Sequence, residues 1–143
     1  MKTEVVYFTR TKHTEKMARV VADVCGVEAI NITEQHRLFD VDCLFIGTGI
    51  YGGKPSAELF RYIDDLPVNQ IKHAVIFSSN FTKKDQTELL INNLRAKGIE
   101  VYPRRFVTTG SFLFLKRKRP NEKDLVALRR FTIKALQELG GNS

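Results

Sequence analysis

The sequence has few cysteines and no long apolar run, and both absences exclude classes of protein. Its two cysteines, Cys25 and Cys43, lie within apolar stretches and show no C-x-x-C spacing. This pattern argues against a disulfide scaffold, a metal centre and a dithiol redox pair, and it favours two buried thiols in a reducing compartment. No apolar stretch approaches the roughly 20 residues of a membrane-spanning helix, and the residues after Met1 are not of the signal-peptide kind. We therefore expect a cytoplasmic protein.

Two ligand-binding signatures are also missing. No G-x-G-x-x-G follows the first apolar run, which disfavours a dehydrogenase that uses a dinucleotide. Response-regulator receivers need acidic residues at the ends of the first and third strands, where this chain has Thr9 and Thr48. Nucleic-acid binding rests on charge alone, because the aromatic and basic motifs of RNA-binding sheets are missing, and we consider it unlikely.

The positive charge is concentrated in the second half of the chain. The 143 residues contain 23 Lys and Arg against 16 Asp and Glu, for a net charge of +7. Residues 72–143 contain 15 Lys and Arg against 6 Asp and Glu, whereas residues 1–71 contain 8 against 10. This asymmetry favours an anionic partner, without choosing between an acidic protein and an anionic lipid surface.

Apolar runs rich in β-branched and aromatic residues alternate with segments of helical periodicity. The predicted strands are 4–8, 27–32, 42–47, 73–79 and 99–107, and the predicted helices are 14–25, 56–66, 84–97 and 121–139. Strands that are apolar throughout and separated by helices predict an α/β domain, residues 1–143, with a parallel sheet covered on both faces. The connection at 33–41 has room for about two helical turns at most. Ligands of such sheets bind beyond the carboxyl ends of the strands.

The first loop at that edge, "TRTKHT" (9–14), leads directly into a helix. The free amide groups and partial positive charge of a helix start suit a phosphate, and Thr9, Thr11 and Thr14 can add hydroxyl donors. Arg10 and Lys12 strengthen this interpretation. The alternative is N-capping by Thr11 or Thr14, which needs only one threonine.

The second and third loops contain small residues and one aromatic each. "GTGIYGGKPS" (47–56) places four glycines around Tyr51, so the backbone can approach a flat ligand that the ring covers; the alternative is a tight turn with Ser56 as N-cap of the next helix. "SSNFTKK" (78–84) supplies small polar residues and Phe81, whose ring can equally pack inward.

The three loops, taken in this order, resemble the flavodoxin family, whose members bind flavin mononucleotide (FMN) non-covalently. The resemblance covers essentially the whole chain and implies a three-layer, flavodoxin-like fold with a five-stranded parallel sheet of order 2-1-3-4-5. "TRTKHTEKMA" looks like the family's phosphate loop, with Lys12 in place of its glycine. Tyr51 falls where the family often places a ring-stacking tryptophan, and Gly52 where a peptide can flip toward the flavin. The residues that the resemblance and the loops assign to FMN are Thr9, Arg10, Thr11, Lys12, His13, Thr14, Thr48, Gly49, Ile50, Tyr51, Gly52, Gly53, Ser78, Ser79, Asn80 and Phe81.

The resemblance implies a redox protein that works by electron transfer or as a two-electron oxidoreductase. Where typical flavodoxins place acidic residues around the flavin, the matching loops have Gly53, Lys54, Lys83 and Lys84. Positive charge favours the reduced, anionic flavin, so our hypothesis is a less strongly reducing flavoprotein. The alternatives are a flavoenzyme like the quinone-linked protoporphyrinogen oxidases and a flavin-free binding module with an anionic partner.

One further stretch, "GSFLFLKRKRP" (110–120), runs from apolar residues into four consecutive bases, Lys116–Arg119. The first interpretation is a sealed sheet edge followed by solvated charges. The alternative is that the bases meet an acidic redox protein or an anionic membrane surface.

Overall fold

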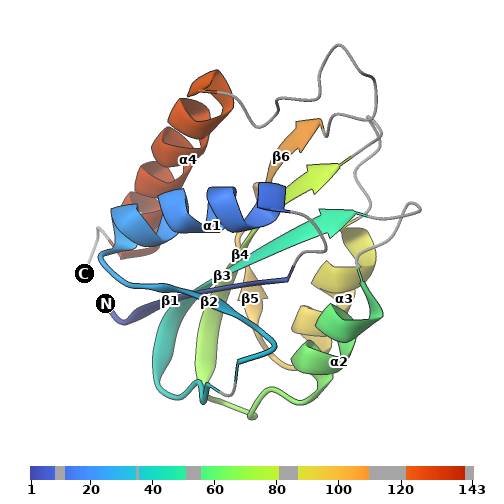
Figure 1. The fold of residues 1–143 in the computed structure, drawn as a ribbon. Helices are drawn as coiled ribbons and strands as arrows, with labels where there is room; N and C mark the ends of the chain where they lie inside the picture. Colours follow the sequence, from blue (N-terminus) through green and yellow to red (C-terminus); the bar gives the residue numbers. More distant parts are fainter. Residues whose placement is uncertain (9–11, 35, 51–55, 81–86, 110–121, 141–143) are drawn as a thin grey trace.

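The computed structural model describes residues 1–8, 12–34, 36–50, 56–80, 87–109 and 122–140. Four helices and six strands lie within these ranges (Figure 1). The strands are β1 (Thr3–Phe8), β2 (Ala29–Asn31), β3 (Val41–Ile50), β4 (Ile71–Asn80), β5 (Glu100–Val101) and β6 (Phe106–Thr109), and the helices are α1 (Lys12–Cys25), α2 (Ala57–Asp64), α3 (Glu88–Ala96) and α4 (Glu122–Gly140).

The strands form one parallel sheet of order β2-β1-β3-β4-β5, with β6 also paired to β4. The predicted flavodoxin-like fold and its 2-1-3-4-5 order are confirmed. The order reverses between β1 and β3, because the chain first builds outward to β2 and then returns across β1. This reversal is the position at which doubly wound sheets bind ligands.

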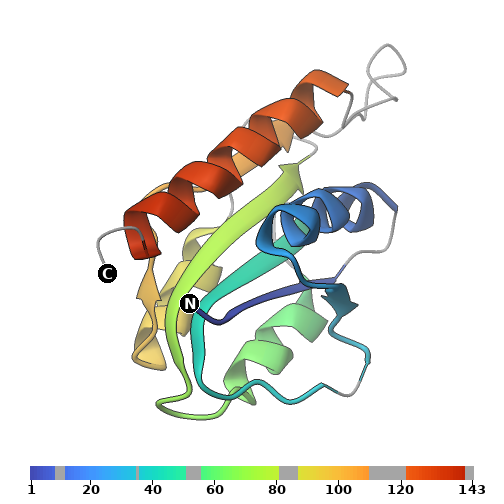
Figure 2. The same ribbon diagram turned by 90° about the vertical axis from the view of Figure 1, so that its left-hand side faces the viewer.

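Helices cover both faces of the sheet, and each face has its own apolar core (Figure 2). On one face, Val5, Phe45 and Phe77 of the sheet pack with buried residues of α1 and α4, including Met17 and Leu128. On the other face, the alternate strand residues pack with α2 and α3. Their buried members include Val6, Leu44, Ile46, Ile76, Leu59, Ile63, Leu90 and Leu94. Successive side chains of a strand point to opposite faces of the sheet, and here helices cover both faces. The central strands are therefore apolar at every position.

The predicted last strand, 99–107, is wrong as one continuous strand. Val101 pairs with Ala74 and Phe106 with Phe77, so five steps along this strand match three steps along β4. Two extra residues therefore bulge from the ladder between β5 and β6. Pro103 lies in this interruption and has no N–H to donate, which is a physical reason for the break.

Strands β3 and β4 extend further than predicted. Thr48, Gly49 and Ile50, which were predicted to lie in the loop after the strand 42–47, instead continue β3 and pair with β4. Gly47 is opposite Phe77, and a Cβ at Gly47 would lie 2.4 Å from Cε2 of that ring. This glycine therefore makes room for a buried aromatic side chain within a strand.

The helix ends agree partly with the sequence analysis. The Ser56 hydroxyl accepts a hydrogen bond from the Leu59 amide at 3.2 Å, so Ser56 caps α2 as expected. Thr14 is the third residue of α1, which excludes it as the N-cap of that helix. The connection at 32–40 contains no helix among its described residues, in agreement with its short length. Both cysteines are free thiols, Cys43 buried and Cys25 half-buried.

Candidate functional site

The carboxyl ends of the central strands bring polar residues from two predicted loops into one row. Phe8 of β1 is paired with Thr48 of β3, Thr48 with Ser78 of β4, and Ser78 with Val107 of β6. The next row pairs Gly49 with Ser79. The structure therefore brings Thr48, Ser78 and Ser79 to the same carboxyl edge, beside the strand-order reversal, as their positions after the apolar runs predict.

The side chains of Ser78 and Ser79 lie on opposite faces of the sheet, because successive side chains alternate along a strand. On the α1 face, the hydroxyls of Thr14 and Ser79 lie 3.3 Å apart and share a hydrogen bond in which either can donate. Thr14 is fully buried and Ser79 is 8% exposed. This contact joins the first turn of α1 to the end of β4, across 65 positions of sequence.

On the α2–α3 face, the paired residues Thr48 and Ser78 are both fully buried. The Thr48 hydroxyl donates to the Gly49 carbonyl at 2.8 Å. The Ser78 hydroxyl is buried and has no hydrogen-bond partner within the described ranges. A buried hydroxyl without a partner costs about 1 to 3 kcal/mol, so a polar partner for this atom would stabilise the site.

The amino-terminal end of α1, which carries partial positive charge, lies at the same carboxyl edge of the sheet. Its described residues there are Lys12, which is exposed, His13, which is half-buried, and Thr14. A helix of 14 residues presents unpaired amides and a partial positive charge at its first turn, both suited to an anion. Lys12 and the Thr14 hydroxyl add to that character.

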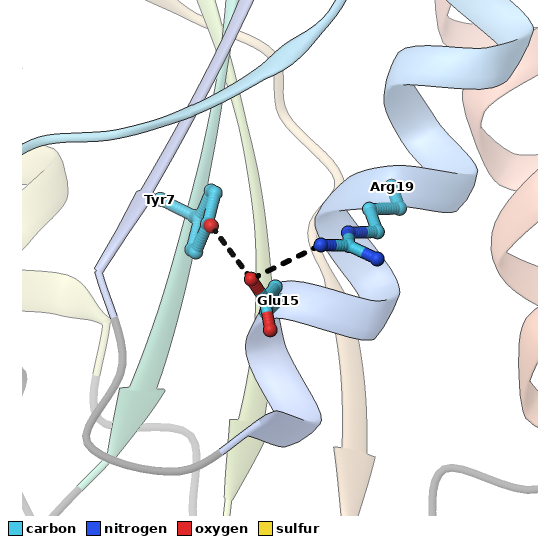
Figure 3. A network of polar contacts seen from close by, with 3 residues as sticks. All are labelled: Tyr7, Glu15 and Arg19. Atoms are coloured by element: carbon cyan, nitrogen blue, oxygen red, sulfur yellow. Dashed lines mark hydrogen bonds and ion pairs between the residues drawn. The ribbon is translucent and has the colours of Figure 1, made fainter. Parts of the chain in front are cut away.

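A network of three side chains holds the first turns of α1 against β1 (Figure 3). The Tyr7 hydroxyl donates to Oε1 of Glu15 at 3.2 Å, and a guanidinium nitrogen of Arg19 lies 3.4 Å from the same oxygen. Burial, followed by the neighbouring Glu15 carboxylate, raises the pKa of Tyr7, which stays a neutral donor near pH 7. Tyr7 and Arg19 thus both contact the Glu15 carboxylate, which lies in the first turn of α1. This network is not among the sequence-based predictions, although the i,i+4 spacing of Glu15 and Arg19 is a signal for half of it.

Several predicted site residues lie outside the described ranges. These are Thr9, Arg10, Thr11, Tyr51, Gly52, Gly53 and Phe81, together with the bases Lys54, Lys83, Lys84 and Lys116–Arg119. Ile50 and Asn80 are the last residues of β3 and β4 and pair with each other.

Other features of the described ranges point to no second chemistry. A surface hollow of about 800 Å³ lies at the amino ends of β4 and β5, opposite the polar row. A groove of about 880 Å³ separates the 32–39 connection from the end of α2. In the described ranges, no group of three His, Cys, Asp or Glu is placed to hold a metal ion, and no helix is long and apolar enough to span a membrane.

Comparisons with known proteins agree with this geometry. The chain is 31% identical over 132 residues to an uncharacterized protein of Methanocaldococcus jannaschii, covering 84% of this chain and 87% of that protein. A flavodoxin from the domain Archaea has a similar structure, with a TM-score of 0.76 at 18% identity over 97% of this chain and 99% of that one. A short-chain flavodoxin associated with a PDU bacterial microcompartment gives a TM-score of 0.70 at 18% identity, over 98% and 100%.

The family model described as a flavodoxin domain matches residues 4–134, which include all six strands except Thr3 of β1, together with the polar row at the carboxyl edge. The chain therefore belongs to the flavodoxin domain family.

Proposed function

We propose that this chain binds FMN at the carboxyl edge of its sheet and works as a flavodoxin-like redox protein. Family membership implies a flavin cofactor and supports a redox role of the flavodoxin kind. The observation that carries the proposal is the contact between Thr14 and Ser79, which places a buried hydroxyl pair at the start of α1. A bound flavin supplies one- and two-electron transfer, while the protein binds, orients and tunes it.

The start of α1 is suited to the phosphate of FMN. The amides of the first turn, the ammonium group of Lys12 and the Thr14 hydroxyl supply donors and positive charge. The hydrogen bond to Ser79 leaves the Thr14 hydroxyl with further hydrogen-bonding capacity. Glu15 is the acidic group of this turn, and its contacts with Tyr7 and Arg19 offset its repulsion of an anion.

The polar row is suited to the polar edge of the flavin ring. Ser78 has an unused donor and two unused acceptor positions within the described ranges, and its neighbour Thr48 keeps acceptor capacity. A flavin ring offers both carbonyl acceptors and an N–H donor, so it can satisfy the Ser78 hydroxyl in either direction. The ends of β3 and β4 thus offer hydrogen-bonding groups that complement those of the flavin ring.

The test compares FMN with riboflavin, which lacks the phosphate. Titrations of the apoprotein, followed by flavin fluorescence, are expected to show much tighter binding of FMN. Thr14→Val removes one hydroxyl and is expected to weaken FMN binding about tenfold while leaving riboflavin affinity unchanged.

Thr132→Val is the matched control. Thr132 is also fully buried, and its hydroxyl donates to the Leu128 carbonyl inside α4 at 2.8 Å. This variant is expected to lower stability while preserving the preference for FMN over riboflavin. Equal affinity of the unmodified chain for the two flavins would refute the phosphate assignment, and equal loss of both flavins in Thr14→Val would refute the role of Thr14.

A further inference from the structure

The outer face of α4 presents a continuous basic stripe. At 3.6 residues per turn, Lys123, Arg130 and Lys134 fall within an arc of about 40° and span about 16 Å of helix. All three side chains are exposed. A shallow hollow of about 310 Å³ lies along the first part of this stripe.

On this face the positions between the three bases are uncharged, and an adjacent acid, Glu122, lies at the border of the stripe, where it lines the same hollow as Lys123. The remaining positions of the stripe are Val126, Ala127, Ile133 and Gln137, and within the described ranges none of the three bases has a carboxylate partner. The contrast on the same helix is Arg129, which lies outside the stripe and pairs with Asp23 of α1 at 3.0 Å. The three positive charges are therefore available to an external anionic surface.

Two exposed apolar side chains accompany the bases. Val126 is 47% and Ile133 is 43% exposed, and both lie along one side of the stripe. The broad apolar side of α4 is already used against the sheet, where Leu128 and Ala135 are fully buried. A helix that inserts into a membrane surface needs such an apolar side free, whereas protein interfaces combine a few apolar contacts with surrounding charge. The composition therefore favours a protein partner.

The stripe begins near the proposed flavin edge. The last residue of α4, Gly140, lies against Met1, at the amino end of β1. Both ribbon views show the first turn of α4 at the other end, toward the strand arrowheads (Figures 1 and 2). Lys123 thus lies toward the carboxyl edge that carries Thr48 and Ser78.

We propose that the outer face of α4, defined by Lys123, Arg130 and Lys134 with Val126 and Ile133, docks an acidic redox protein. The inference that this docking serves electron transfer rests on the proposed function, but docking itself does not require a bound flavin. Complementary charge steers the encounter and accelerates association by tenfold or more at low ionic strength. The partner would then lie beside the edge at which we place the flavin.

The test exchanges the three bases together, as Lys123→Gln, Arg130→Gln and Lys134→Gln. The probe is an acidic plant-type [2Fe–2S] ferredoxin. Calorimetry with the oxidised ferredoxin measures docking to the apo chain, so this arm is valid even if FMN does not bind. Stopped-flow absorbance measures one-electron transfer from the reduced ferredoxin to the FMN-loaded chain, with one ferredoxin oxidised for each electron accepted.

The matched control removes the same charge elsewhere, as Arg37→Gln, Arg61→Gln and Arg95→Gln. These side chains are exposed and belong to the 32–40 connection, α2 and α3, away from α4. Both triple variants lower the net charge equally, so only a local docking site can separate them. All substitutions are at exposed positions, and far-ultraviolet circular dichroism verifies that the helices are retained.

The α4 variant is expected to bind ferredoxin about tenfold more weakly and to accept electrons about tenfold more slowly, against less than about twofold for the control. The difference should disappear at 1 M salt, where the Debye length is about 3 Å. Equal effects in the two variants, or no effect in either, would overturn the proposal. Vesicles of phosphatidylglycerol and phosphatidylcholine are tested in parallel, and lost vesicle binding with unchanged ferredoxin binding would make the stripe a lipid-docking surface instead.

Discussion

Replacing Gly47 with alanine would put a methyl carbon into the space of the Phe77 ring. The new Cβ would lie 2.4 Å from Cε2 and 2.5 Å from Cζ, whereas ordinary contacts begin near 3.4 Å. The ring or strand β3 must therefore shift by about 1 Å. Phe77 is fully buried in the core under α1 and α4, so the ring has no open space to enter.

Overpacking of this kind costs about 1 to 3 kcal/mol, partly offset by the lower chain entropy of alanine in the unfolded state. We expect Gly47→Ala to lower the free energy of unfolding by about 1 to 2 kcal/mol, measured by urea denaturation followed by circular dichroism. The slope against urea should not change, because the surface exposed on unfolding is nearly the same.

A second substitution separates the clash from other effects. Phe77→Leu removes the contacting ring atoms, so the double variant with Gly47→Ala should be more stable than the sum of the two single effects, by about 1 kcal/mol. Gly26→Ala is the control. Its φ of +72° makes alanine unfavourable there, but a Cβ would meet nothing within 4 Å, so its effect should add to that of Phe77→Leu. An additive result for Gly47→Ala would refute the packing explanation.

Two further predictions concern the α1 network and the thiols. Tyr7→Phe removes the hydroxyl that donates to Glu15 and is expected to lower the free energy of unfolding by about 1 kcal/mol. In a chain that already carries Glu15→Ala, the same substitution should have little effect. A full effect in that background would exclude the hydrogen bond as the cause. Burial raises the pKa of the Cys43 thiol to about 12 and that of Cys25 to about 11, from 9.0, so both are neutral at pH 8 and should react with Ellman's reagent only after unfolding. Because both thiol pKa values are raised in the folded state, the neutral thiols contribute their full stability below about pH 9, and this contribution is lost as the pH rises toward 11 to 12. Alkaline denaturation should therefore begin at a higher pH in Cys43→Ala. Rapid reaction of Cys43 in the native chain would contradict its burial.

The order of elements was predictable from the sequence because apolar runs and helical periodicity reflect burial directly. The parallel sheet, its covered faces, the cap at Ser56 and the grouping of Thr48 with Ser78 all follow from patterns that are local in the chain. Gly49 was assigned to a loop because glycine usually indicates a turn, and Gly47 was placed at the junction of the predicted strand and that loop. Gly47 is paired with Phe77, which is 30 positions away, and Gly49 with Ser79, and no local pattern in the sequence reports these contacts.

The remaining differences also depend on distant partners. Pro103 suggested no interruption in an otherwise strand-like run, and only the pairing with β4 reveals the two extra residues beside it. The Thr14 hydroxyl was interpreted as a possible cap, although its hydrogen-bond partner is Ser79 of β4. Tyr7 lies within the predicted strand 4–8, and its hydroxyl has a partner only because the helix that follows places Glu15 beside it.

The break between β5 and β6 affects how copies of this protein meet. An unpaired outer strand exposes amide and carbonyl groups that can recruit a strand from another molecule, and long, flat borders are the most exposed to such recruitment. Here one border strand, β2, has three residues, and on the other side β5 has two and β6 has four, separated by the bulge at Pro103. Within the part of the chain that the structure describes, neither border offers a long continuous strand for another molecule to pair with. Short, interrupted border strands of this kind disfavour edge-to-edge association, even though the central strands are strongly apolar.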